Sequence, residues 1–134
     1  MRFLNASVSP TIVTKGDKLI GVLSTPGGDN QDQALLQVLL NIIDFNMPPQ
    51  QAVEAARFTS QHFYSSFGYH ELYPAVVKFE NRIPDSIATV LRQRLERVHV
   101  QRIHVWALFA VDLDVDESLV HDLGDVRVLE TFVG

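Results

Sequence analysis

One stretch, residues 19–44, limits what this chain can fold into more than any other. It begins with the apolar run Leu19–Leu23, passes through Ser24-Thr25-Pro26-Gly27-Gly28-Asp29, and ends in a long apolar segment. Proline fixes φ and glycine admits positive φ, so the Pro-Gly-Gly sequence ends a strand sharply. The stretch therefore predicts a strand, a tight turn and a helix in direct succession.

The helix is expected over residues 30–46. Its polar residues recur every three or four positions and share one narrow stripe, so we expect the helix to be mostly buried. The stripe consists of Gln33, Gln37, Asn41 and Asp44. The turn then places the backbone N–H groups of Gly27 and Gly28 at the helix N-terminus, where unpaired donors and the helix dipole favour negative charge. Two interpretations remain open here: a tight connection in which glycine serves only the backbone geometry, or a site for an oxyanion or a carboxylate.

Composition excludes several classes of function. The 134 residues, 46% hydrophobic and 20% charged, indicate one globular domain, and a net charge of −5 argues against nucleic acid as a partner. There is no cysteine, which excludes disulfides, thiolate metal sites and a cysteine nucleophile. No apolar run approaches the roughly 18 residues that span a bilayer and the start lacks a signal peptide. We therefore expect a soluble, cytoplasmic protein without membrane contact.

The rest of the chain predicts a mixture of strands and helices, and hence an α+β fold. The first strand is expected to form a hairpin with residues 19–23 through the turn Lys15-Gly16-Asp17-Lys18. Residues 57–73 carry aromatic side chains without a period, which indicates an irregular segment packed on the core surface. Strands are expected at 11–13, at 75–80, in the sheet interior at 104–111 and at an edge at 126–133. Helices are expected at 50–56 and, lying on a sheet, at 84–97.

No metal site is expected. The sequence Asp112-x-Asp114-x-Asp116 is similar to the start of a calcium loop, but position six is Glu117 instead of glycine and position twelve is Leu123 instead of an acid. An acidic, solvated face is the better interpretation. The remaining candidate ligands lack the spacing that a metal needs, and they are His62, His70, His99 and His104.

Four segments of the chain, in order and spacing, resemble the small subunit of γ-glutamyltransferases. They are Ala6-Ser7-Val8-Ser9-Pro10-Thr11-Ile12-Val13, Ser24-Thr25-Pro26-Gly27-Gly28-Asp29, residues 36–45 and residues 51–58. The Thr-Pro-Gly-Gly-Asp form is closer to the γ-glutamyltransferase-like and acylase branch. The resemblance covers residues 2–58 with specific motifs and 75–111 more weakly, whereas the acidic segment 112–134 does not match the family's closing segment.

The resemblance implies a fold and a chemistry. The fold would be part of the αββα sandwich of N-terminal nucleophile hydrolases, with a largely antiparallel sheet and packed helices. In this family a precursor cleaves itself, a threonine becomes the first residue of the small subunit, and that threonine attacks a γ-glutamyl amide such as that of glutathione. No metal or cofactor is implied.

Carried over by position, the resemblance makes the N–H groups of Gly27 and Gly28 the oxyanion hole. Two family serines that hold the substrate's α-carboxylate match Ala6 and Ser7, so Ser7 alone keeps that role. The family's Pro-Arg-Phe motif has Ala56 in place of proline and retains Arg57. The nucleophilic threonine has no counterpart, because none of the threonines is N-terminal: Thr11, Thr14, Thr25, Thr59, Thr89 and Thr131.

Two functional hypotheses follow. In the first, the chain is the C-terminal part of a γ-glutamyltransferase-like enzyme and supplies the oxyanion hole and Ser7 to a site whose nucleophile lies on a missing segment or another chain. In the second, it is a non-catalytic interaction domain derived from that family, with the acidic tail as its contact surface. In both, we expect the chain alone to be inactive, and to associate with itself as a dimer or with a missing large subunit or N-terminal segment.

Overall fold

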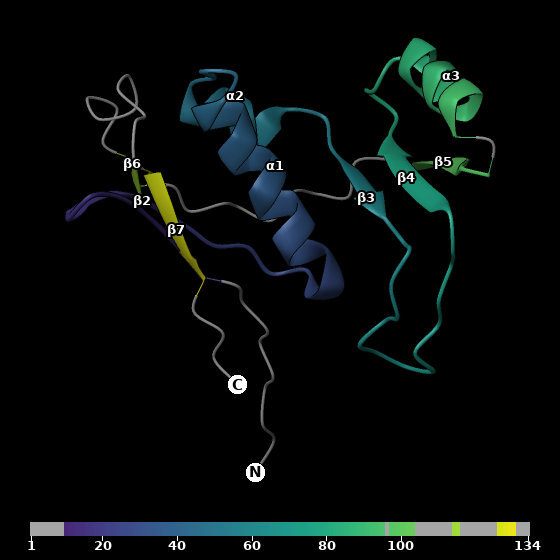
Figure 1. Cartoon of the computed structure of the whole chain (residues 1–134), viewed down its shortest axis with the longest axis horizontal. Coiled ribbons are helices and arrows are strands. Elements are labelled where there is room, and N and C mark those ends of the chain that lie inside the picture. The colour runs from purple at the N-terminus through teal and green to yellow at the C-terminus, as the bar shows by residue number, and fades with distance from the viewer. Residues whose placement is uncertain (1–9, 96, 104–113, 116–125, 131–134) are drawn as a thin grey trace. The chain divides into compact units, whose positions relative to one another are not determined.

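The structure is a computed structural model that describes residues 10–95, 97–103, 114–115 and 126–130 (Figure 1). The chain divides into two compact units, one of residues 1–55 with 109–134 and the other of residues 56–108. Each unit is described by itself. In the described part of the chain, no helix is both long and apolar enough to cross a bilayer.

The first unit contains an antiparallel sheet of four strands in the order β6-β2-β1-β7. Its strands are β1 (Thr11–Lys15), β2 (Lys18–Leu23), β6 (Asp114–Val115) and β7 (Val126–Glu130). β1 and β2 form the expected hairpin, and Gly16 in its turn has φ 57. The pairing shifts register between Val13 and Thr14. The hairpin and the C-terminal edge strand were both predicted from the sequence and are confirmed.

Helix α1 (Gln31–Ile43) packs on this sheet, preceded by the short 3-10 turn η1 (Gly28–Asn30) and followed by α2 (Pro49–Glu54). The core joins the sheet to both helices through Val13, Ile20, Leu23, Leu35, Val38, Leu39, Ile42 and Ala52. The expectation that α1 is mostly buried is wrong, since Leu36 is 55% and Leu40 38% exposed. The core covers one face of α1, and the second apolar stripe, which includes Leu36 and Leu40, lies outside the core.

The connection from α1 to α2 is short and hydrogen-bonded. Asn46, at φ 52, adopts the left-handed conformation that commonly ends a helix, and the Met47 N–H donates to the Asn41 carbonyl at 2.9 Å. The Asn41 side chain donates to the Ala52 carbonyl of α2 at 3.4 Å. Pro49 stands in the first turn of α2, as the sequence predicts.

The second unit contains a mixed sheet in the order β3-β4-β5. β3 (Phe58–Ser60) is antiparallel to β4 (Val76–Glu80), and β4 is parallel to β5 (His99–Ile103), with α3 (Asp85–Arg94) between them. The sequence predicted β4 and α3 but missed β3. The strand expected at 104–111 lies outside the described residues.

The covered face of α3 differs from the expected one. Ala88 is the buried residue of this helix, and Leu91 is half-buried. Ile87, Val90 and Leu95 are each about half exposed, so the expectation that this stripe lies on the sheet is wrong. A small side chain at position 88 allows close packing there.

Residues 61–75, which we call the aromatic loop, connect β3 to β4. The expectation that its aromatic side chains pack on the core is wrong, since most of them are exposed. They are Tyr64, Phe67, Tyr69 and Tyr73. The loop's order comes from its own hydrogen bonds instead.

Candidate functional site

The candidate site is the turn between β2 and α1. Thr25 is buried and its hydroxyl donates to the Pro26 carbonyl at 3.0 Å. Gly27 has φ 147 and Gly28 has φ 61, conformations that strain a residue with a side chain. A Cβ at Gly27 would meet the Gln31 side chain only at 3.8 Å, which is ordinary contact. Backbone conformation, and not lack of space, therefore requires glycine at this position.

The two glycine N–H groups have different surroundings. Within the part of the chain that the structure describes, the Gly28 N–H donates to no other backbone group, while the Gly28 carbonyl accepts from the Gln31 N–H. Pro26 forms an isolated β-bridge, and because proline has no N–H, the bridge is made through its neighbours, including Gly27. The Gly28 N–H is therefore the stronger candidate for binding a ligand.

Charge at the turn has two opposing sources. The N-terminus of the 13-residue helix α1 carries partial positive charge, and the acidic residues Asp29 and Asp32 lie in the first turns of η1 and α1. These carboxylates stabilise the helix and also weaken its attraction for a permanent anion.

The predicted substrate-binding residue Ser7 cannot be compared with this turn. Ser7 and Ala6 lie outside the described residues. Among the residues that are described, no three histidine or acidic side chains gather in a way that could hold a metal ion. The two residues that the structure places together are thus Gly27 and Gly28, with Thr25 and Gln31 supporting them.

A buried charge cluster in the second unit was not found from the sequence. Arg57 and Glu80 are both buried, with Nε and Oε1 4.0 Å apart, and Arg82 Nη2 lies 2.7 Å from Oε2 of Glu80. Burial lowers the pKa of Arg57, an effect that Glu80 opposes and Arg82 reinforces. Among the described residues, the buried Nη2 of Arg57 has no hydrogen-bond partner. One carboxylate thus serves two guanidinium groups, and Arg57 depends on it for charge compensation.

A sequence profile of the family described as γ-glutamyltranspeptidase matches residues 4–127. The match continues past residue 111, into the acidic segment. The glutathione hydrolase proenzyme of Pseudomonas sp. (strain A14) is 50% identical over 56 residues, which are 42% of this chain and 10% of that protein. The acylase ACY 1 proenzyme of Pseudomonas sp. (strain V22) is 30% identical over 92 residues, 69% of this chain and 14% of that protein. The chain spans about a tenth of the length of these relatives.

The fold has counterparts among solved structures. A crystal structure of Helicobacter pylori γ-glutamyltranspeptidase superposes with a TM-score of 0.63 at 24% identity, over 97% of this chain and 63% of that one. Its fold is that of the N-terminal nucleophile hydrolases, so the predicted fold class is confirmed. With the profile covering nearly all of the sequence, the chain belongs to the γ-glutamyltranspeptidase family.

Proposed function

We propose that this chain is the C-terminal part of a γ-glutamyltransferase-like N-terminal nucleophile enzyme that hydrolyses or transfers γ-glutamyl or acyl amides of the glutathione type. Family membership and relatives named glutathione hydrolase and acylase support the proposal. The observation that carries it is the turn, in which Gly27 and Gly28 both have positive φ directly before α1.

In this proposal the turn stabilises the transition state of acyl transfer. Attack on an amide carbonyl moves negative charge onto its oxygen, and the Gly28 N–H donates to that oxygen. The Gly27 N–H, which also takes part in the β-bridge at Pro26, is the second and weaker donor. The loss of one such donor typically lowers the rate about 10²–10³-fold. Asp29 and Asp32 lie in the first turns of η1 and α1, where their negative charge opposes the developing oxyanion, so direct donation from the N–H groups has to outweigh that repulsion. Ser7 would hold the substrate's α-carboxylate.

The nucleophile in this proposal lies outside these 134 residues. A threonine of this class uses its own free α-amine as general base, so it must be the first residue of a mature chain. We assign it to an upstream segment or a separate chain, which is then the obligatory partner. The chain alone would have an oxyanion hole but no agent for the covalent step, and would therefore show no turnover.

The test is a reconstitution assay with a chromogenic γ-glutamyl anilide. The purified chain is assayed alone and then mixed with a separately produced upstream segment that begins at a free threonine. We expect turnover only in the mixture. Turnover by the chain alone would contradict the proposal, and an inactive but assembled mixture would favour the interaction-domain hypothesis.

Gly28→Ala and Gly16→Ala form a matched pair for the mixture. The two glycines have φ 61 and φ 57, so alanine strains the backbone similarly at both, by about 1–2 kcal/mol. Only Gly28→Ala shifts an N–H at the candidate oxyanion hole, and a misplacement of about 1 Å can lower the rate about 10²-fold. Equal kcat values for the two variants would remove Gly28 from the mechanism.

A further inference from the structure

The last residue of the aromatic loop, Ala75, has a strained backbone that two hydrogen bonds hold in place. Its φ is 59, in the left-handed region that disfavours a residue with a side chain. Such a conformation persists only where its surroundings enforce it. The Ala75 N–H donates to His62 Nδ1 at 3.0 Å, and the Ala75 carbonyl oxygen accepts from the His99 N–H at 2.8 Å. His62 thus fastens the end of the loop to its beginning.

The hydrogen bond to His62 requires a neutral imidazole. An N–H can donate to Nδ1 only while Nδ1 has a free lone pair, so the single ring proton is on Nε2. A second proton would bind to Nδ1 and make it a donor that faces the Ala75 N–H. His62 is exposed, so protons reach it freely, and imidazole titrates between about pH 5 and 8. The bond is therefore present at the upper end of this range and lost as the pH falls.

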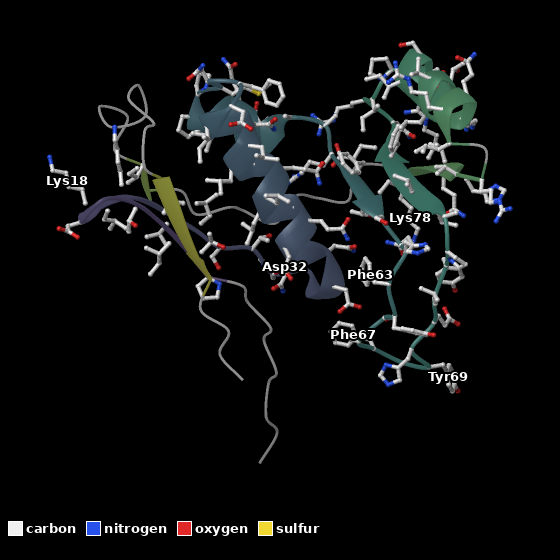
Figure 2. The ribbon with its side chains drawn as sticks, viewed as in Figure 1. Lys18, Asp32, Phe63, Phe67, Tyr69 and Lys78 are labelled. Atoms are coloured by element: carbon white, nitrogen blue, oxygen red, sulfur yellow. The ribbon has the colours of Figure 1, made fainter. Side chains whose placement is uncertain are left out.

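His70, in the tip of the loop, responds differently to a proton. Its Nδ1 lies 2.7 Å from the Ser65 carbonyl oxygen, which can only accept, so Nδ1 already carries a proton. A second proton binds to Nε2 and leaves this bond in place. Figure 2 shows the neighbouring Phe67 and Tyr69 at the end of the loop that lies away from β3 and β4. Acid therefore acts on the base of the loop and spares its tip.

Other charges leave the bond at His62 to decide the response. The charged and titratable groups of the elements beside His62 are Lys78 and Glu80 of β4, His99 and Arg102 of β5, and His70, Glu71 and Tyr73 of the loop. Strand residues alternate between faces, so Lys78, Glu80 and His99 lie on the face opposite to Ser60. Arg102 pairs with Asp85, and Glu71 accepts a hydrogen bond from the Tyr73 hydroxyl. Among the described residues, no carboxylate pairs with His62 and compensates its positive charge.

We propose that His62 is a pH-sensitive clasp, which holds the aromatic loop closed on Ala75 while the imidazole is neutral and releases it on protonation. Release also lets Ala75 leave the left-handed region, which weakens its second bond, to the His99 N–H. Exposed side chains such as Tyr64 and Tyr69 are then carried by a fixed backbone at neutral pH and by a mobile one in acid.

Nuclear magnetic resonance of the ¹⁵N-labelled chain between pH 8 and pH 5 tests the clasp. A scalar coupling between the Ala75 amide nitrogen and His62 Nδ1 reports the hydrogen bond itself, and the ring ¹⁵N shifts of His62 report its protonation. We expect the coupling at pH 8 and its loss in step with protonation. The protection of the Ala75 amide against hydrogen exchange should fall about fivefold or more. The amide of Val38, which is buried in α1, should keep its protection.

His62→Asn and His70→Asn form a matched pair of variants. The side-chain oxygen of asparagine can take the place of Nδ1 and accepts at every pH, so His62→Asn should keep Ala75 protected down to pH 5. His70→Asn retains a donor for the Ser65 carbonyl and should leave the response of Ala75 within about twofold of the wild type. Circular dichroism establishes that each variant is folded.

Four results would overturn the proposal. The first is a wild type without the coupling at pH 8, and the second is a coupling that survives the protonation of His62. The third is an equal loss of protection at Val38, which would mean that acid unfolds the whole chain. The fourth is a folded His62→Asn variant in which Ala75 responds to pH as in the wild type. If His62→Asn does not fold, the coupling in the wild type decides, because it needs no substitution.

Discussion

Replacing Glu80 by glutamine should destabilise the chain by about 2–4 kcal/mol. The Glu80 carboxylate lies 4.0 Å from Arg57 Nε, and both side chains are less than 10% exposed. At an effective dielectric constant of about 20, two unit charges at this distance attract by about 4 kcal/mol. Glutamine keeps the volume and an acceptor for Arg82, whose side chain is 43% exposed and regains water. Arg57 loses its charge compensation, and no described residue is a hydrogen-bond partner of its Nη2.

Urea unfolding followed by circular dichroism measures the effect as a lower midpoint at an unchanged slope. Asp85→Asn is the matched control, because Asp85 also pairs with an arginine, Arg102, but its side chain is 95% exposed. That variant should cost less than about 1 kcal/mol. In an Arg57→Met background, which removes the buried cation, Glu80→Gln should cost about 1 kcal/mol or less. The reasoning is refuted if Glu80→Gln costs the same in both backgrounds, or less than about 1 kcal/mol in the wild type.

Two further predictions concern packing and the aromatic loop. Leu23→Ala should lower the free energy of unfolding by about 2–5 kcal/mol, because Leu23 is 1% exposed in the core. Leu36→Ala should change it by less than about 0.5 kcal/mol, because Leu36 is 55% exposed. Urea unfolding compares the two variants, and equal losses would show that α1 buries both faces. His62→Ala should speed hydrogen exchange at the Ala75 amide, because that amide loses its acceptor. His99→Ala, which changes an exposed histidine of β5, should leave this exchange rate unchanged. An unchanged rate in His62→Ala would show that this hydrogen bond does not hold the loop.

The elements that the sequence predicted are those with local signals at their ends. β2, the glycine turn and α1 follow from an apolar run, a Pro-Gly-Gly sequence and a helical period, all of which act within a few residues. β3 has three residues, too few for an alternating pattern, and it exists through pairing with β4. Periodicity also identifies an apolar face without saying what covers it, which is why the exposure of Leu36 and Ile87 was not foreseen.

The candidate site, like the fold, could be predicted from the sequence only in part. Positive φ at Gly27 and Gly28 could be predicted, because glycine pairs before a helix have few other uses. The Arg57–Glu80 pair could not, since its partners are far apart in sequence. They meet because β3 and β4 pair with Phe58 opposite Phe79, which places the Glu80 N–H 3.1 Å from the Arg57 carbonyl oxygen. Alternation along β4 does not reveal that a charged residue is buried.

The position of β1 in its sheet has a consequence for the order in which this chain is made. β1 pairs with β2, the next strand, and also with β7, where Thr11 lies opposite Glu130 and Lys15 opposite Val126. On a ribosome that adds about 5–20 residues per second, the hairpin would wait roughly 5 to 20 seconds for β7 to emerge. During that interval one edge of β1 has no strand beside it and can pair with another nascent chain. Synthesis that stops before residue 126 would make this exposure permanent.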